Sequence, residues 1–156
     1  MIELLFLLGF TLHNIEEALW LPKWSKHAKK FHKEVSDNEF RFAIIIVTII
    51  GYLLTFQYLI FANKSQFSRY IFLGFILMMV INTFLPHLAA TMVLKKYAPG
   101  TITGLLLNVP IGLYLLYNYI QTQHELLMVI LCGIALAVII VPLLNLFFKA
   151  GKRLLG

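Results

Sequence analysis

The stretch IELLFLLGFTLHNIEEALWL (residues 2–21) has the length and apolar character of a transmembrane helix, since about 20 helical residues cross the hydrocarbon core of a bilayer. No basic segment precedes this run and no small-residue cleavage site follows it, so we expect a span rather than a signal peptide. The run nevertheless contains three ionisable residues, His13, Glu16 and Glu17. Ionisable groups inside a span are costly unless they are paired, liganded or hydrated, and by default they indicate a functional site.

Four further apolar runs follow the first one. Hydrophobic residues make up 60% of the 156-residue chain, whereas charged residues make up 13%, and a water-soluble domain of this length cannot bury so much apolar surface. We therefore predict an all-α polytopic membrane protein, a single domain over residues 1–156 built as a bundle of five transmembrane helices. The predicted spans are residues 2–21, 41–62, 70–94, 101–120 and 125–148.

Basic residues are concentrated in alternate connections of this five-span arrangement. Eleven of the thirteen follow the first span, follow the third span or lie at the C-terminus, namely Lys23, Lys26, Lys29, Lys30, Lys33, Arg41, Lys95, Lys96, Lys149, Lys152 and Arg153. The positive-inside rule then predicts that the N-terminus lies outside and the C-terminus lies in the cytoplasm. Contact with anionic lipid head groups explains the formal net charge of +6, so no nucleic-acid partner is expected.

The connections between spans also carry local signals. Apolar residues recur at helical spacing among the first group of lysines, at Trp24, Ala28, Phe31 and Val35. This pattern predicts a short interfacial helix on the cytoplasmic leaflet. Ser36 and Glu39 have the spacing of a capping box that begins the second span, and Pro99-Gly100 predicts a tight turn between the third and fourth spans.

The polar residues inside the spans share one depth. Successive helical residues advance by about 100°, so Glu16 and Glu17 flank His13 on a single face. With a rise of about 1.5 Å per residue, His87 and Asn108 in the third and fourth spans lie at the level of His13, roughly 5–10 Å inside the cytoplasmic boundary. We therefore predict that the first, third and fourth spans meet around a pocket that opens toward this boundary, lined by His13, Glu17, His87 and Asn108.

Residues at four-residue spacing extend these predicted faces. Thr83 and Thr91 flank His87 and are expected to line the pocket. Two glycines flank Asn108 in the same way, which lets a neighbouring backbone approach closely. The second and fifth spans are expected to be mainly packing scaffold, with peripheral contributions from Thr48 and Asn145, and Asn82 is expected to be an interhelical hydrogen-bonding residue.

This combination of residue types suits a metal or a proton relay. A His and a Glu three or four residues apart on a helix can hold one cation, and a second His would leave an open position for water, as in catalytic zinc sites. We therefore predict a divalent metal, with zinc as first choice, held by His13, Glu16 or Glu17 or both, and His87. A glutamate outside the ligand set would act as general base or orient a histidine. Without metal, the same His–Glu pairs could transfer protons.

Three classes of function fit such a site. The leading hypothesis is an integral membrane enzyme that acts on a lipid or another hydrophobic small molecule, with Glu16 and Glu17 as catalytic residues. Hydrolysis by metal-activated water is the first choice of reaction and acid–base isomerisation the second. The alternatives are a small proton-coupled carrier that uses the His–Glu cluster, and a non-catalytic membrane assembly factor. The sequence gives no indication of the oligomeric state.

The run His13-Asn14-Ile15-Glu16-Glu17 resembles the motif of the HxxEE family of small bacterial membrane proteins. The family is named for this motif and has an additional histidine later in the chain, for which His87 is our candidate. The resemblance covers nearly the whole chain and implies a bacterial plasma membrane protein with an enzyme-like site, without an established reaction. A looser similarity to five-span sterol isomerases and other EXPERA-domain proteins rests only on a His and a Glu four residues apart, as His13 and Glu17 are here.

Overall fold

The computed structural model describes residues 1–28 and 33–155. Over these residues, five helices are long and apolar enough to cross a membrane, as predicted. The first two are α1 (Ile2–Ser25) and α2 (Asp37–Phe61). The third combines α3 (Gln66–Asn82), η1 (Thr83–Leu88) and α4 (Ala89–Leu94). The fourth combines α5 (Thr101–Thr103), η2 (Gly104–Asn108) and α6 (Val109–Tyr119), and the fifth is α7 (Gln123–Leu155).

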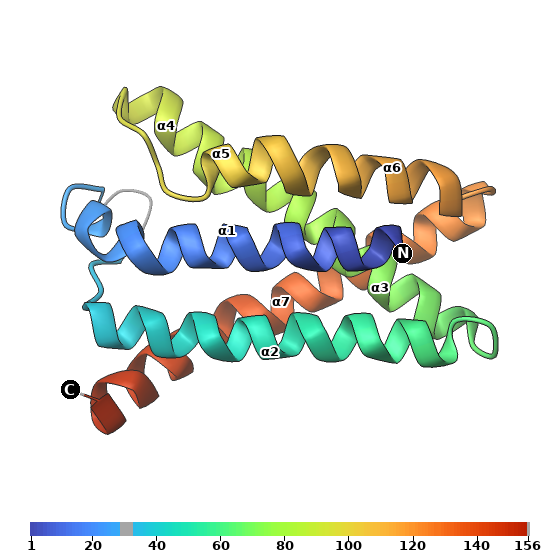
Figure 1. The fold of residues 1–156 in the computed structure, drawn as a ribbon, viewed down its shortest axis with the longest axis horizontal. Helices are drawn as coiled ribbons and strands as arrows, with labels where there is room; N and C mark the ends of the chain where they lie inside the picture. Colours follow the sequence, from blue (N-terminus) through green and yellow to red (C-terminus); the bar gives the residue numbers. More distant parts are fainter. Residues whose placement is uncertain (29–32, 156) are drawn as a thin grey trace.

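The helices form a bundle whose basic segments gather at one end. In Figure 1, α1 and α2 run antiparallel, and α7 crosses behind them from the right of the view to the lower left. The start of α2, the turn between α4 and α5, and the C-terminus lie at the left end, and the N-terminus lies at the right. The side of the membrane that each end faces stays a prediction from the charge distribution.

The segment between α1 and α2 differs in part from the sequence prediction. Helix α1 continues through Trp24 to Ser25, and residues 33–36 are not helical. The predicted interfacial helix is therefore wrong over these residues, and its remaining part, around Phe31, lies outside the described residues. The capping box is confirmed, since Ser36 accepts a hydrogen bond from the backbone of Glu39 and the Glu39 side chain accepts one from Ser36.

Two apolar clusters hold the bundle together at different levels. One is rich in aromatic rings, where Phe75 packs edge-to-face against Phe6 and Phe10 with ring centroids 5.8 and 5.1 Å apart. The other lies toward the end where the basic segments gather, and contains Leu21, Val35, Phe40, Ala43 and Phe148. The polar residues of α1 lie between these two clusters along the helix, in a layer that neither cluster fills.

The third and fourth spans both leave regular α-helical geometry near this polar layer. Segments η1 and η2 are π-helical, and η1 is interrupted at Leu85, whose backbone is extended (φ −131°, ψ 109°). Pro86 lacks the N–H that would bond the carbonyl four residues earlier, which is a common cause of such a break. Single π-helical turns are often found at functional sites because they change which side chains face inward.

Candidate functional site

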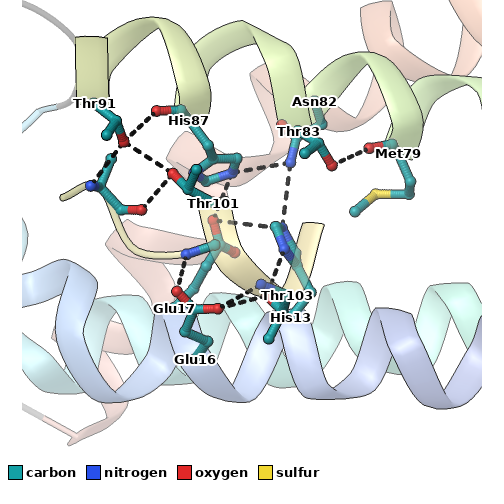
Figure 2. A network of polar contacts seen from close by, with 12 residues as sticks. His13, Glu16, Glu17, Met79, Asn82, Thr83, His87, Thr91, Thr101 and Thr103 are labelled. Atoms are coloured by element: carbon teal, nitrogen blue, oxygen red, sulfur yellow. Dashed lines mark hydrogen bonds and ion pairs between the residues drawn. The ribbon is translucent and has the colours of Figure 1, made fainter. Parts of the chain in front are cut away.

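Three of the predicted site residues converge between α1 and η1. Figure 2 shows His13 and Glu17 projecting from α1 toward His87 of η1. His87 Nε2 lies 3.1 Å from Glu17 Oε1, His13 Nε2 lies 4.0 Å from the same oxygen, and the two imidazole rings meet edge to face with centroids 5.1 Å apart. All three side chains are buried. We refer to His13, Glu17 and His87 as the triad.

Asn82 contacts both histidines of the triad, although its expected role from the sequence was interhelical hydrogen bonding. Its Nδ2 lies 3.1 Å from His87 Nε2 and 3.5 Å from His13 Nε2. Five residues of ideal α-helix would place Asn82 and His87 about 140° apart, but the break at Leu85 and the π-helical turn bring them onto one side. Pro86 was the residue in the sequence that indicated this break. It cannot donate to the carbonyl of Asn82 and therefore disrupts the α-helical register at this point.

His87 Nε2 faces two polar partners at the same distance. When protonated, this nitrogen donates to the Glu17 carboxylate, and when unprotonated it accepts from the Asn82 amide. A histidine nitrogen with a carboxylate on one side and an amide donor on the other is stabilised in both states. The arrangement therefore suits proton transfer, and it equally suits replacement of the proton by a cation.

Glu16 points away from the triad and anchors the segment that begins the fourth span. Its carboxylate accepts hydrogen bonds from the Tyr97 hydroxyl, from Gly100 N at 2.6 Å, and from both the backbone and the hydroxyl of Thr103 at 3.2 and 2.6 Å. The Thr103 hydroxyl lies 3.3 Å from His13 Nδ1. Because this hydroxyl donates to Glu16, its oxygen is available to accept a hydrogen bond from His13 Nδ1–H.

A chain of contacts therefore connects Glu16 to the triad through Thr103 and His13. With its proton on Nδ1, His13 presents the lone pair of Nε2 toward Glu17 and His87. Histidine ligands of metals commonly donate their second ring N–H to an oxygen in this way, which fixes the tautomer and the ring orientation. The two adjacent glutamates of the motif thus occupy different environments, with Glu17 inside the triad and Glu16 supporting it.

Gly100 fits between the two imidazoles, and no larger residue fits there without movement. Its φ of +92° lies in the left-handed region that favours glycine. A Cβ at this position would lie 2.8 Å from His13 Cε1 and 2.9 Å from His87 Cε1. The predicted turn at Pro99-Gly100 therefore also positions backbone against both histidine rings.

Tyr97 lies outside the spans and donates to Glu16. Burial and, to a smaller extent, the hydrogen bond to the Glu16 carboxylate together raise the pKa of its hydroxyl to about 12. The hydroxyl therefore stays protonated at physiological pH, and it can serve as a permanent donor. Its oxygen also accepts a hydrogen bond from the backbone of Ile102 at 3.3 Å, which links the turn to the start of α5.

The triad lies at the wall of a pocket of about 410 Å³. The other lining residues are mostly apolar and come from α1, α2, α3, η1 and α7, including Phe10, Leu21, Phe40, Val47, Met78 and Leu144. Helices α2 and α7 therefore form much of the pocket wall, and the prediction that they serve mainly as scaffold is wrong. Fourth-span residues do not line this pocket; instead, the start of that span covers the opposite side of the two imidazoles.

The remaining predicted pocket residues lie at contacts between helices rather than in the pocket. Thr83 packs against Gly104, where an added Cβ would lie 2.5 Å from its Cγ2, and Thr91 Oγ1 lies 3.0 Å from Thr101 Oγ1. Asn108 is fully buried next to Gly9, and its side-chain atoms have no hydrogen-bond partner among the described residues. None of Thr83, Thr91 and Asn108 lines the pocket beside the triad.

The peripheral residues named from the sequence also lie outside the triad. Thr48 accepts a hydrogen bond from Asn14 Nδ2 at 2.8 Å, and Asn145 is exposed on α7. Neither side chain is part of the pocket wall, although both residues were expected to contribute at its edge. In the part of the chain that the structure describes, the polar residues of the pocket are instead His13, Asn14, Glu17, Asn82 and His87.

The three residues of the triad form a group that could hold a metal ion. One ligand atom from each of its residues lies within 4.8 Å of the other two. Ligand atoms of a tetrahedral zinc ion with bonds of about 2.0–2.2 Å are separated by about 3.3–3.5 Å. The His87–Glu17 distance of 3.1 Å is close to this value, and the His13–Glu17 distance of 4.0 Å requires an approach of about 0.5 Å. Two imidazole nitrogens and one carboxylate oxygen would leave a fourth position for water.

Comparison with known proteins identifies the family. The chain belongs to the family described as "Protein of unknown function with HXXEE motif", whose model matches residues 4–115. This region includes the motif residues of α1 and both histidines of the triad. The chain is also similar to "Uncharacterized protein YrkK" of Bacillus subtilis (strain 168), with 44% identity over 149 residues that cover 95% of this chain and 94% of the relative. No solved structure gives a significant match.

Proposed function

We propose that this protein is an integral membrane enzyme whose triad holds one divalent metal ion, with zinc as first choice, and that it hydrolyses a lipid or another hydrophobic substrate. The observation that carries the proposal is the position of the triad at the wall of an otherwise apolar pocket. Buried ionisable groups in a span are costly, so their convergence on one point indicates a site rather than packing. Such a metal would supply an activated water and polarise a carbonyl oxygen.

In this scheme some residues bind the metal ion and others orient its ligands. His13, Glu17 and His87 provide the ligands, and Thr103 holds His13 in the tautomer that directs Nε2 toward them. Glu16 acts through Thr103 and the turn at Gly100, so it is a positioning residue in this scheme. Asn82, 3.1 Å from His87 Nε2, lies close enough to donate a hydrogen bond to a group bound at the open position.

A metal-free acid–base enzyme is the second candidate, and one contact favours it. The ion pair between Glu17 and His87 at 3.1 Å already places a proton donor and a proton acceptor together beside the pocket. This pair could move a proton between two carbons of a bound substrate, as an isomerisation requires. The carrier hypothesis has less support, because the aromatic cluster around Phe6, Phe10 and Phe75 fills the bundle on the other side of the triad.

We place the site in the cytoplasmic half of a bacterial plasma membrane, with the N-terminus outside. Support comes from the basic residues that gather at the end of the bundle nearer to the triad, where they would meet anionic head groups. A site at this depth is within reach of both acyl chains and cytoplasmic water. A lipid ester is therefore the class of substrate that the location favours.

Metal analysis of the purified protein tests the proposal. Wild-type protein, purified in detergent without chelator, should contain about one equivalent of divalent metal, with zinc expected from the donor set. His13→Ala, His87→Ala and Glu17→Gln should each lose most of it. His124→Ala, which removes an exposed histidine at the start of α7, is the matched control and should retain the wild-type content.

Lipid analysis provides the second measurement. Bacterial cells that express the wild-type protein should accumulate a free acid or alcohol from a membrane ester, and cells that express Glu17→Gln at equal level should not. Metal-free wild-type protein that still changes the lipid profile would reject the metal and leave the acid–base enzyme. Metal binding that survives all three triad substitutions would reject the site itself.

A further inference from the structure

Over the described residues, the pocket beside the triad is lined by buried apolar side chains at the end where the basic segments gather. Leu21, Phe40 and Phe148 line the pocket there, and all three are buried members of the apolar cluster at that end. Phe40 and Phe148 stack with ring centroids 6.0 Å apart. Among the described residues, this end of the pocket is therefore apolar and packed, whereas an opening toward the cytoplasmic boundary was predicted from the sequence.

The side of the pocket between η1 and α7 is different. Three exposed residues line this side, Ile81, Leu85 and Val141, with 51%, 65% and 60% of their surface accessible. The first two lie at the end of α3 and in the interrupted helix η1, and the third lies on α7. Figure 1 shows α7 and the third span crossing and then diverging toward opposite sides of the bundle. All three residues are apolar and lie within spans, so this side faces hydrocarbon.

We propose that this gap is a lateral entrance through which a single acyl chain passes from the bilayer into the pocket, so that its carbonyl group meets the triad. The chemistry of the walls supports this occupant, because the lining contributed by the described residues is apolar except for the triad, Asn14 and Asn82. A chain with one polar end matches a pocket with one polar wall. The volume of about 410 Å³ is near the lower limit of ligand pockets, roughly 300–1,000 Å³, and suits one chain rather than two.

The proposal rests on the proposed function only for the orientation of the carbonyl group toward the triad. Binding of the chain itself needs neither metal nor turnover, so the two can fail separately. If wild-type protein contains the metal but does not bind an acyl chain, the entrance is overturned and the metal site stands. Chain binding in a protein without metal would leave the entrance and remove the hydrolase.

Tryptophan fluorescence provides the measurement, since Trp24 lines the pocket and the chain has two tryptophans. Trp20→Phe leaves Trp24 as the single tryptophan. A brominated C18 fatty acid or its methyl ester is then added to this protein in detergent micelles. Each probe should quench the Trp24 fluorescence with a component that saturates at about one equivalent of probe per protein molecule. Ala137→Phe, which fills the pocket from α7, should abolish that component. Ala135→Phe, two residues away and exposed outside the pocket, should leave it unchanged.

The entrance is tested by a bulky label at its edge. In a Cys132→Ser background, maleimide labelling of Val141→Cys should remove the saturable quenching, whereas equal labelling of Ile139→Cys should not. Ile139 is exposed on the same helix but does not line the pocket. Quenching that rises only linearly with both probes, or that is unaffected by Ala137→Phe, would overturn the pocket. Saturable quenching by a brominated diacyl lipid, without saturable quenching by the two single-chain probes, would overturn the assignment of a single acyl chain as the occupant. Saturable quenching that persists in labelled Val141→Cys would overturn the lateral entrance.

Discussion

Replacing Gly100 by alanine should disturb the proposed metal site, because the added methyl group meets both histidine rings of the triad. The added Cβ would lie 2.8 Å from His13 Cε1, 2.9 Å from His87 Cε1 and 3.0 Å from His87 Nδ1, so both rings must move by several tenths of an ångström to reach normal contact distances of about 3.5–4.0 Å. The positive φ of +92° adds about 1–2 kcal/mol for a residue with a Cβ. Overpacking adds about 1–3 kcal/mol.

The assay is a zinc competition titration against a chromophoric chelator, together with thermal unfolding in detergent. Gly100→Ala should lower the apparent zinc affinity by about 10–100-fold, the usual effect of displacing ligand-orienting groups, and should lower the unfolding temperature. Gly133→Ala is the matched control, because its Cβ would lie 3.1 Å from the Gly74 carbonyl oxygen, away from the triad. It should lower stability without a change in zinc affinity. Wild-type zinc affinity in folded Gly100→Ala would refute the close packing of Gly100 against both rings.

Three further predictions follow from the supporting contacts and the topology. Thr103→Val, which keeps the shape but removes the hydroxyl between His13 and Glu16, should lower zinc affinity by about 10-fold, measured by the same titration, and an unchanged affinity would refute the role of this hydroxyl. Tyr97 has a pKa raised from 10.0 to about 12, so its stabilising contribution should be complete below pH 10 and lost as the pH rises through 12. Wild-type protein should therefore lose thermal stability between these pH values, and Tyr97→Phe should not show this loss. Identical pH profiles of the unfolding temperature for the two proteins would contradict the role of the Tyr97 hydroxyl. Reporter fusions at Lys64 and at the C-terminus should report opposite sides of the membrane, and a common location would contradict the predicted topology.

The spans could be predicted because hydrophobic length is a one-dimensional property of the chain. The depth of a residue within its span is also one-dimensional, and it predicted that His13 and His87 lie at one level of the bundle. Rotation about a helix axis is less predictable. Regular α-helical periodicity through residue 94 predicts Thr83 and Thr91 beside His87, whereas the π-helical turn and the break at Leu85 bring Asn82 there instead.

The two glutamates illustrate a second limit. Their adjacency on α1 indicated a shared site, but α-helical geometry separates neighbouring side chains by about 100°, and the structure uses this separation. Glu17 faces His87, and Glu16 faces the turn that contains Gly100. Donors such as Tyr97 and Thr103 come from another part of the chain, and their approach depends on tertiary packing that no local pattern encodes.

The contribution of α2 and α7 to the pocket was hidden for a similar reason. Their residues in the pocket wall are apolar, as are those that face lipid, so composition does not distinguish the two surfaces. Ala137 and Leu144 line the pocket, whereas Val138 and Leu146 on the same helix are exposed. Only the crossing of α7 behind α1 and α2 decides which of them faces the triad (Figure 1).

X-ray absorption spectroscopy of the metal in chelator-free wild-type protein tests the central claim most directly. If the triad is a zinc site, the spectrum should show nitrogen and oxygen ligands at about 2.0–2.2 Å, with multiple scattering from two imidazoles, and the imidazole signal should fall in His13→Ala and in His87→Ala. A protein that contains no metal, or a metal whose ligand shell is the same in both variants, would contradict the assignment of His13, Glu17 and His87 as its ligands.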